Sequence, residues 1–312
     1  MTFELVTGGA GFIGSHVVEA LLTKGKQVRV VDDLSTGHLH NLSPFQEQAG
    51  DRLQFLHGSL ADPAIAAEAV RGVKRVYHLA ARPSVPWSFQ EPELAFTANH
   101  GTTLALIEAA KNSPVERIVF SSSAAIYGDL PGLPKLETDV LAPQSPYADH
   151  KLAGEHALQD AAQAGFFSAV ALRYFNVYGP RQDPSSPYSG VISLFADWVI
   201  QNKGATIYGD GLQSRDFVFA HDVAQANLAG GLASLDDSFA AVNIAGGQSI
   251  SILDLWKLLN EAVGRKTPSP EHLPGREGDI RHSLASIDAA AATLDWKPRM
   301  PIADGLKLTL GL

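Results

Sequence analysis

The sequence predicts an α/β fold, in which a doubly wound parallel sheet is followed by a smaller mixed α/β domain. Three observations support this prediction. Short β-branched runs alternate with longer helical patterns in the first half of the chain, which is typical of βαβ units with right-handed crossovers. The runs are almost entirely apolar, as expected for strands that helices cover on both faces. A glycine-rich loop joins the first apolar run to the first helical pattern.

The elements of the first half follow in order from this alternation. Strands are expected at Phe3–Thr7, Gln27–Val31, Leu53–Leu56, Arg75–Leu79, Arg117–Ser121 and Ala169–Tyr174. Helices are expected between them, at Ile13–Lys24, Pro63–Val70, Leu94–Lys111 and Pro146–Ala164.

The composition changes after about Tyr178, where segments rich in Pro, Gly and Ser indicate loops. We predict a first domain over residues 1–176 and a smaller substrate-binding domain over residues 177–312, with the chain crossing back near residues 213–245. Short strands are expected in this half at Thr206–Tyr208 and Val242–Ile244, and helices near Val191–Gln201, Asp222–Gly230 and Ile252–Val263.

The composition excludes several classes of function. The 312 residues carry 24 Lys and Arg against 33 Asp and Glu, so the net charge of −9 disfavours binding to nucleic acid or to an anionic membrane surface. Cysteine is absent, which excludes disulfides, cysteine-ligated zinc and a cysteine nucleophile. No apolar run approaches the ~20 residues of a membrane span, and the first residues lack a signal-peptide pattern. We therefore expect a cytoplasmic protein.

The glycine loop predicts a dinucleotide site in a Rossmann-type sheet. Gly8, Gly11 and Gly14 are spaced three apart between a strand and a helix, which suits a tight turn, a close approach to a pyrophosphate, and close packing of helix and strand. Asp32 ends the next strand, near the ~20-residue distance of the acid that binds the ribose. Its carboxylate would repel a 2′-phosphate, so the pattern favours NAD over NADP.

A tyrosine and a lysine occupy one face of a predicted helix. Ser145 suits the N-cap and Pro146 the first turn, so Tyr147 and Lys151 lie one turn apart. An ammonium near the phenol is expected to lower the pKa of Tyr147 from ~10. The tyrosine is then a candidate general base near neutral pH.

Hydroxyl groups end another predicted strand, at Ser121–Ser123. Ligands of open α/β sheets bind at the carboxyl ends of strands, where such a hydroxyl can hydrogen-bond a substrate oxygen. The adjacent pair His221 and Asp222 lacks a metal-binding pattern around it, so we interpret it as the start of a helix and predict no metal site.

Together these motifs resemble the extended short-chain dehydrogenase/reductases, and within them the nucleotide-sugar 4-epimerases. The resemblance spans essentially the whole chain. It rests on the glycine loop, Asp32, His78–Ala81, Ser121–Ser123, Tyr147 with Lys151, Arg173–Arg181, Gly209–Gly211, Arg215–Phe217 and Arg276–Asp279.

The resemblance implies a role for each matching residue. Tyr147 is the catalytic base, Lys151 holds the nicotinamide ribose, and Ser123 binds the sugar 4-hydroxyl, a role that suits Ser122 less well. The implied NAD contacts are Gly8, Gly11, Phe12, Ile13, Gly14, Asp32, Ser59, Leu60, Leu79, Ala80, Ala81, Asn99 and Lys151. The implied substrate contacts are Ser84, Ser123, Tyr147, Asn176, Val191, Tyr208, Arg215, Arg276, Asp279 and Ser283. Among them Asn176, Arg215 and Arg276 face the phosphates, Asp279 the uridine ribose and Tyr208 the uracil.

The chain departs from the family pattern at two places. Ser59 stands where many relatives have an Asp that contacts adenine, and Gly101 comes one position earlier than usual after Asn99. Neither departure touches the implied chemistry, but the adenine contact of Ser59 is left open.

The reaction that the resemblance implies is interconversion of UDP-GlcNAc and UDP-GalNAc through a 4-keto sugar, with UDP-glucose and UDP-galactose as further substrates. Ser283 occupies a position that lines the pocket near the sugar 2-substituent, where relatives with Tyr favour the sugars without an acetamido group. A 4,6-dehydratase would carry acidic groups at Ala124 and Ala125. The sequence neither favours nor excludes a nucleotide-sugar decarboxylase. A non-catalytic dinucleotide sensor would usually have lost Tyr147 and Lys151, and both are present here. The resemblance also implies a homodimer formed by Leu94–Lys111 and Pro146–Ala164.

Overall fold

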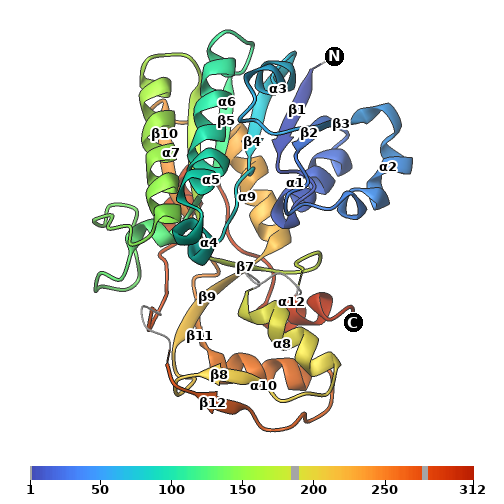
Figure 1. The fold of residues 1–312 in the computed structure, drawn as a ribbon, viewed down its shortest axis with the longest axis vertical. Helices are drawn as coiled ribbons and strands as arrows, with labels where there is room; N and C mark the ends of the chain where they lie inside the picture. Colours follow the sequence, from blue (N-terminus) through green and yellow to red (C-terminus); the bar gives the residue numbers. More distant parts are fainter. Residues whose placement is uncertain (1, 184–189, 276–279) are drawn as a thin grey trace.

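A seven-stranded sheet forms the centre of the first region in the computed structural model, which describes residues 2–183, 190–275 and 280–312 (Figure 1). The strand order is β10-β6-β5-β4-β1-β2-β3, and every pairing is parallel. This confirms the predicted α/β fold with a doubly wound parallel sheet. The strands are β1 (Phe3–Thr7), β2 (Gln27–Asp32), β3 (Leu53–His57), β4 (Val73–His78), β5 (Arg117–Ser123), β6 (Ser168–Tyr174) and β10 (Phe239–Ile244).

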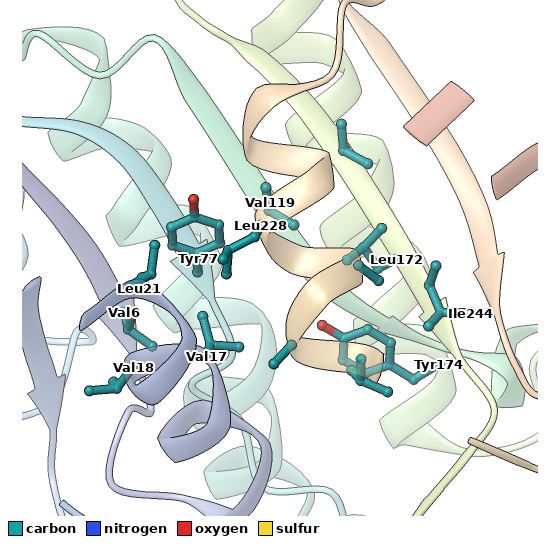
Figure 2. Close-up of a cluster of buried hydrophobic side chains, with 14 of the residues drawn as sticks. Val6, Val17, Val18, Leu21, Tyr77, Val119, Leu172, Tyr174, Leu228 and Ile244 are labelled. Carbon is teal, nitrogen blue, oxygen red and sulfur yellow. The ribbon is translucent and has the colours of Figure 1, made fainter. Parts of the chain in front are cut away.

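Helices cover both faces of this sheet, and each face has its own core. Successive residues of β1 point to opposite faces, so Val6 belongs to the cluster under α1 and α9 while Leu5 belongs to the cluster under α3, α6 and α7. Figure 2 shows the first cluster, where Leu228 of α9 and Val17 of α1 meet the sheet. The helices of this region are α1 (Phe12–Thr23), α2 (Ser43–Ala49), α3 (Pro63–Ala69), α4 (Val85–Gln90), α5 (Pro92–Phe96), α6 (Thr102–Lys111), α7 (Pro146–Gln163), α9 (Ala220–Leu232) and α11 (Asp288–Leu294), with the short turns Leu39–Asn41, Gly50–Arg52 and Ala124–Tyr127.

The helix predicted over Leu94–Lys111 is divided into three parts, and this corrects the sequence prediction. A π-helical turn over Thr97–Gly101 separates α5 from α6. The turn inserts an extra residue into the helical ladder, a feature that often marks functional sites. Hydrophobic periodicity alone does not reveal it, because the apolar face resumes after the turn. The turn contains Asn99, which is buried.

In the described residues of the second region, two small sheets pack against three helices around a separate core. One sheet has the order β11-β9-β7, and the other pairs β12 with β8. The strands are β7 (Asn176–Tyr178), β8 (Thr206–Tyr208), β9 (Ser214–Phe219), β11 (Ser249–Ser251) and β12 (Glu271–Leu273), and the helices are α8 (Val191–Ile200), α10 (Ile252–Ala262) and α12 (Ile302–Thr309).

The chain passes between the two regions more than once. After β9 it enters α9 and β10, which lie in the first region, and it then returns to β11 and α10 (Figure 1). The division at residue 176 stays a prediction of where the domains separate. Within the described parts of the chain, none of the helices combines the length and the apolar character that a membrane span requires.

Candidate active site

The predicted catalytic residues and the glycine loop lie at the carboxyl edge of the large sheet. The glycine loop follows β1, the segment Leu79–Arg82 follows β4, and Ser123 ends β5. These three strands are neighbours in the order β5-β4-β1, so their ends meet along one edge. Such an edge is where open α/β sheets bind their ligands.

The glycine loop has the geometry of a pyrophosphate cradle. Gly8 has a φ of +67°, and a Cβ at this position would lie 2.8 Å from the backbone nitrogen of Ala80. A Cβ at Gly14 would lie 2.1 Å from the carbonyl oxygen of Gly8. Gly11 is the N-cap of α1 and offers no side chain to the helix, so the first backbone N–H groups, at Phe12 and beyond, can face an anion. These residues fit a dinucleotide.

Asp32 has a structural role beside its predicted ribose contact. Its Oδ2 accepts a hydrogen bond from the Ala10 backbone at 2.9 Å, and its Oδ1 accepts one from Leu34 at 2.8 Å. Each carboxylate oxygen can accept a second hydrogen bond, so capacity for ribose hydroxyls remains. Burial raises the pKa of Asp32, while these backbone hydrogen bonds lower it. The contact with the ribose stays a prediction.

A buried polar chain supports the loop after β4. The Thr7 Oγ1 accepts hydrogen bonds from the backbone of Leu79 and Ala80, so its hydroxyl proton is directed to the His78 Nδ1 at 2.8 Å. The His78 Nε2 then donates to the Thr103 Oγ1 at 3.0 Å, because the Thr103 hydroxyl is itself donated to the carbonyl of Asn99. Burial and the charge of Lys151 lower the pKa of His78 to about 3. The neutral imidazole therefore fixes the loop that is predicted to line the cofactor, a role that the sequence did not indicate.

The predicted catalytic residues come together as expected, but their protonation differs from the sequence prediction. Burial raises the pKa of Tyr147, and a hydrogen bond with Ser123 lowers it in part. Lys151 lies with its Nζ 5.9 Å from the centre of the Tyr147 ring and donates to the carbonyl of Ser121 at 2.8 Å. Burial also lowers the pKa of Lys151 to about 7. The expectation that the ammonium lowers the tyrosine pKa is therefore wrong for the protein alone, because desolvation of the phenol is the larger effect.

Two sets of contacts hold the helix that carries Tyr147 and Lys151, one at its first turn and one at Glu155. Ser145 caps α7 by accepting a hydrogen bond from Ala148, and the Tyr147 backbone donates to the Ser88 Oγ on α4 at 3.2 Å. One turn beyond Lys151, Glu155 forms a buried bidentate ion pair with Arg173 of β6, with N–O distances of 3.1 and 2.9 Å. A pair of this kind holds one helix register against the sheet.

Several other predicted NAD and substrate contacts serve the fold as well. Asn99 accepts a hydrogen bond from the Arg82 backbone at 2.7 Å, Ser59 accepts one from Ala61, and Ser84 caps α4. Leu60 is buried in the core under α3, α6 and α7. The contacts of these residues, and of Ile13, Leu79, Ala80 and Ala81, with NAD or substrate stay predictions.

The predicted residues for the nucleotide and the sugar lie on the second region. Asn176 is exposed at the start of β7 and pairs with Phe217 of β9, Arg215 lies two residues before Phe217 on β9, and Tyr208 ends β8. Val191 begins α8, and Ser283 lies next to β9, where its backbone nitrogen donates to Ser214 at 3.0 Å. Their substrate contacts stay predictions, and Arg276 and Asp279 lie outside the described residues.

Comparisons with known proteins agree with this arrangement. The model of the NAD dependent epimerase/dehydratase family matches residues 4–245. The UDP-glucose 4-epimerase of Mycolicibacterium smegmatis is 36% identical over 309 residues, which make up 98% of this chain and 96% of that protein.

Two solved structures share the fold over almost the whole chain. The UDP-N-acetylglucosamine 4-epimerase of Methanobrevibacter ruminantium, in complex with UDP-N-acetylmuramic acid, has a TM-score of 0.93 and 36% identity over 99% of this chain and 97% of that one. The UDP-glucose 4-epimerase of Thermus thermophilus, in complex with NAD, has a TM-score of 0.87 and 36% identity over 99% and 98% of the two chains. These findings confirm the family resemblance and the predicted NAD cofactor. The chain belongs to the NAD dependent epimerase/dehydratase family, and NAD is its cofactor.

Proposed function

We propose that the protein is an isomerase that interconverts UDP-GlcNAc and UDP-GalNAc by inverting the configuration at carbon 4 of the sugar. The observation that carries this proposal is the buried Tyr147 hydroxyl, hydrogen-bonded with Ser123 at the same sheet edge that carries the glycine cradle. Both groups that a sugar 4-hydroxyl requires, a proton acceptor and a hydrogen-bond partner, are thus present together. Ala124 and Ala125 follow Ser123 and cannot transfer protons, which disfavours a dehydratase.

The proposed chemistry divides between the cofactor and three side chains. When bound at the glycine cradle, NAD would supply the hydride acceptor for the sugar carbon and, once reduced, the hydride donor, so that no cofactor is consumed. The Tyr147 oxygen takes the proton of the 4-hydroxyl and gives it back on the return step. Ser123 hydrogen-bonds the same sugar oxygen and partly offsets the effect of burial on the Tyr147 pKa, while Lys151 holds the ribose.

Ser283 supports the choice of an acetylated sugar. Its backbone is held on both sides, because its nitrogen donates to the Ser214 carbonyl and its own carbonyl accepts from the Ser249 Oγ at 3.1 Å. The small side chain is therefore fixed beside the strand that carries Arg215. An acetamido group needs more space than a hydroxyl, and a serine leaves that space where a tyrosine would occupy it. The similar structure from Methanobrevibacter ruminantium, named a UDP-N-acetylglucosamine 4-epimerase, also supports this choice.

The test is incubation of the purified protein with UDP-GlcNAc and, separately, with UDP-glucose, without added cofactor. We expect the 4-epimers to appear in both, faster with UDP-GlcNAc, and NAD rather than NADP to be released on denaturation. Ser283→Tyr should lower turnover of the acetylated sugars selectively, whereas Ser234→Tyr, at an exposed position after α9, should leave both rates unchanged. A protein that converts neither sugar would contradict the proposed function, and equal effects on both sugars would contradict the role of Ser283.

We also propose that the enzyme is a homodimer in the cytoplasm. Large apolar side chains are exposed on the helices of one face: Leu94 and Phe96 on α5 are 57% and 47% exposed, and Leu104 on α6 is 42% exposed. A second copy that packs the same helices against them would cover this surface in a symmetric interface. Light scattering after size-exclusion chromatography should give twice the chain mass, and Leu94→Glu should shift it to one chain mass. The cysteine-free sequence supports a reducing compartment.

A further inference from the structure

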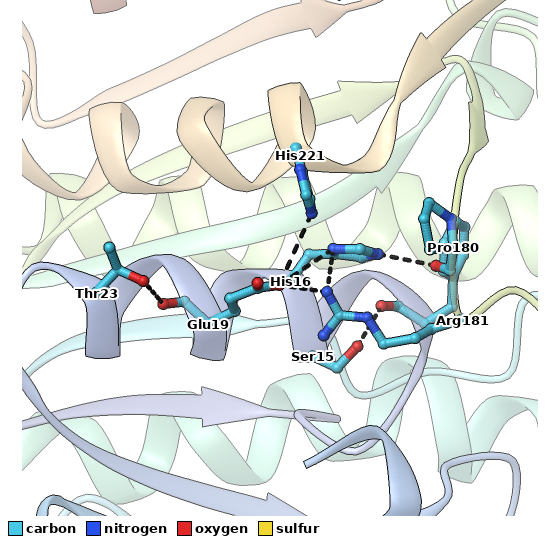
Figure 3. A network of polar contacts seen from close by, with 8 residues as sticks. Ser15, His16, Glu19, Thr23, Pro180, Arg181 and His221 are labelled. Carbon is cyan, nitrogen blue, oxygen red and sulfur yellow. Dashed lines mark hydrogen bonds and ion pairs between the residues drawn. The ribbon is translucent and has the colours of Figure 1, made fainter. Parts of the chain in front are cut away.

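Four side chains from three segments meet on the side of α1 that faces α9 (Figure 3). His16 and Glu19 belong to α1, His221 to the start of α9, and Arg181 to the loop after β7. The Arg181 Nη2 donates to the His16 Nδ1 at 2.6 Å and also to the Glu19 Oε2. The His221 Nε2 lies 3.7 Å from the same Glu19 oxygen. We call Arg181, Glu19 and His16 the Arg181 clasp.

The buried imidazole of His16 binds two consecutive residues of the loop. Its Nε2 lies 2.9 Å from the carbonyl oxygen of Pro180, which can only accept, so the Nε2 carries the proton and the Nδ1 is the acceptor for Arg181. Burial and the charge of Arg181 lower the pKa of His16 to about 3. The imidazole therefore stays neutral, which is the only form that can donate to Pro180 and accept from Arg181 at once.

The Arg181 guanidinium lies where the side chains of His16, Glu19 and His221 could otherwise hold a metal ion. His16, Glu19 and His221 form the one set of three metal-ligand side chains found among the described residues, with ligand atoms within 4.8 Å of one another. The Arg181 guanidinium bonds two of these three ligands. Its positive charge opposes a metal ion at the same place, so we assign the cluster to the clasp.

The clasp lies at one end of a strand pair whose other end carries the predicted phosphate contacts. Strands β7 and β9 are parallel, with Tyr178 opposite Phe219 next to the clasp and Asn176 opposite Phe217. Each strand residue advances about 3.3 Å, so Asn176 lies only ~7 Å along β7 from Tyr178. Arg215 lies on β9 two residues before Phe217. A shift of the clasped end would therefore move both predicted phosphate contacts with it.

The backbone of the loop has a conformation that needs support from its surroundings. Arg181 has a φ of +68°, a left-handed conformation that a non-glycine residue rarely adopts without support from its surroundings. The clasp connects this loop to the helix whose N-terminus forms the pyrophosphate cradle. One helix thus forms the predicted cofactor site at its first turn and contacts the loop after β7 at its second turn.

We propose that the Arg181 clasp is a positioning device that sets the β7–β9 pair, and the nucleotide sugar bound to it, against NAD. The inference rests on the proposed function for its substrate. Hydride transfer depends on sub-ångström placement of donor and acceptor, so a loosened clasp lowers kcat even where both ligands still bind.

The experiment compares Arg181→Ala with the wild-type holoenzyme and with Lys74→Ala. Lys74 forms an exposed ion pair with Glu116 at the opposite edge of the sheet, so its variant controls for the loss of a surface pair. We expect Arg181→Ala to lower kcat about ten-fold or more and to weaken UDP binding several-fold, while NAD per chain stays unchanged. Added guanidinium ion should restore part of kcat. A purely structural role would lower the melting temperature and leave kcat unchanged well below it.

Two His16 variants test the hydrogen bonds that the buried imidazole makes with Pro180 and Arg181. His16→Gln keeps one donor and one acceptor and should retain most of the activity, whereas His16→Leu keeps neither and should behave like Arg181→Ala. Hydrogen exchange of the β7 and β9 amides provides a readout that needs no substrate, and it should accelerate in Arg181→Ala and His16→Leu only.

Three outcomes would overturn the proposal: unchanged kcat and exchange in Arg181→Ala, equal behaviour of the two His16 variants, or binding of one Zn²⁺ per wild-type chain that His16→Leu abolishes. Failure of the proposed function looks different. The wild-type protein would then convert no UDP-sugar, while hydrogen exchange would still decide whether the clasp holds the strands.

Discussion

The cofactor cradle and the catalytic edge are built in opposite ways. The cradle between β1 and α1 depends on side chains that are missing, since a Cβ at Gly8 or Gly14 would collide with backbone. The edge between β5 and α7 depends on side chains that are present and buried, namely Tyr147, Lys151 and Ser123 with their partners. NAD binding at the cradle should therefore be lost when one carbon is added to a glycine. Catalysis at the sheet edge should be lost when one side-chain oxygen is removed.

The most complete loss of function is expected for Gly14→Ala, because it removes the cofactor itself. The added Cβ would lie 2.1 Å from the Gly8 carbonyl, so the loop has to open. Overpacking of about 1–3 kcal/mol or more corresponds to a ten- to hundred-fold loss of NAD affinity at about 1.4 kcal/mol per factor of ten. The dinucleotide recovered after denaturation should fall to a small fraction of one per chain, and epimerisation should fall with it. Gly230→Ala in α9, where a Cβ would make ordinary contacts, is the control and should retain NAD.

At the catalytic edge, Tyr147→Phe is expected to remove turnover without removing the cofactor. The variant keeps the ring and removes the proton acceptor, so kcat should fall by about 100-fold or more, while NAD content and UDP binding are retained. Steady-state kinetics and released dinucleotide measure the two quantities separately. Turnover near that of the wild type would exclude Tyr147 as the base. The catalytic edge would then not depend on this side-chain oxygen.

Arg173→Met tests what holds the edge together. Breaking a buried ion pair by removing one partner costs about 3–5 kcal/mol, because the Glu155 carboxylate is left buried without its bidentate partner. The free energy of unfolding, measured in denaturant, should fall by that amount. Lys111→Met, which breaks an exposed pair with Glu108, should leave the unfolding free energy nearly unchanged. Similar losses in both variants would show that the Arg173 pair is not special to the edge.

The smallest expected effect is a pH dependence of stability that arises from Lys151. Burial lowers the pKa of Lys151 to about 7 in the folded protein, below its value of about 10.4 in the unfolded chain. Between these two values the unfolded chain binds the extra proton, so the stability of NAD-free protein should rise with pH, by at most about 1.4 kcal/mol per unit from this group. Lys151→Met should remove that slope in denaturant titrations at pH 7, 8 and 9. An identical slope in both proteins would contradict the assignment.

The cradle could be predicted from the sequence, because its requirements are local. A strand, three glycines and a helix follow one another in the chain, and α1 begins within one residue of its predicted start. The parallel sheet was predictable for the same reason, since each βαβ unit is a continuous segment.

The support of the edge could not be predicted, because it depends on contacts between distant residues. The short helix α4 supplies Ser88 to the start of α7 but is too short for a periodic signal. The raised pKa of Tyr147 follows from burial, which no spacing rule reports. His16 and Arg181 lie 165 positions apart in the chain, so neither motif indicates the other.

The position of β10 has a consequence for the order in which the protein is made. This strand pairs with β6 along its whole length, yet all of β7, α8, β8, β9 and α9 is synthesised between the two. During translation β6 is therefore an exposed edge strand until the chain has left the ribosome as far as Ile244. Since α9 also covers the face of α1 and the sheet, a nascent first region has neither its last strand nor its cover. The cofactor site and the substrate strands consequently mature in the same late step of biosynthesis, and a shortened chain that ends before β10 should be a target for proteases and chaperones.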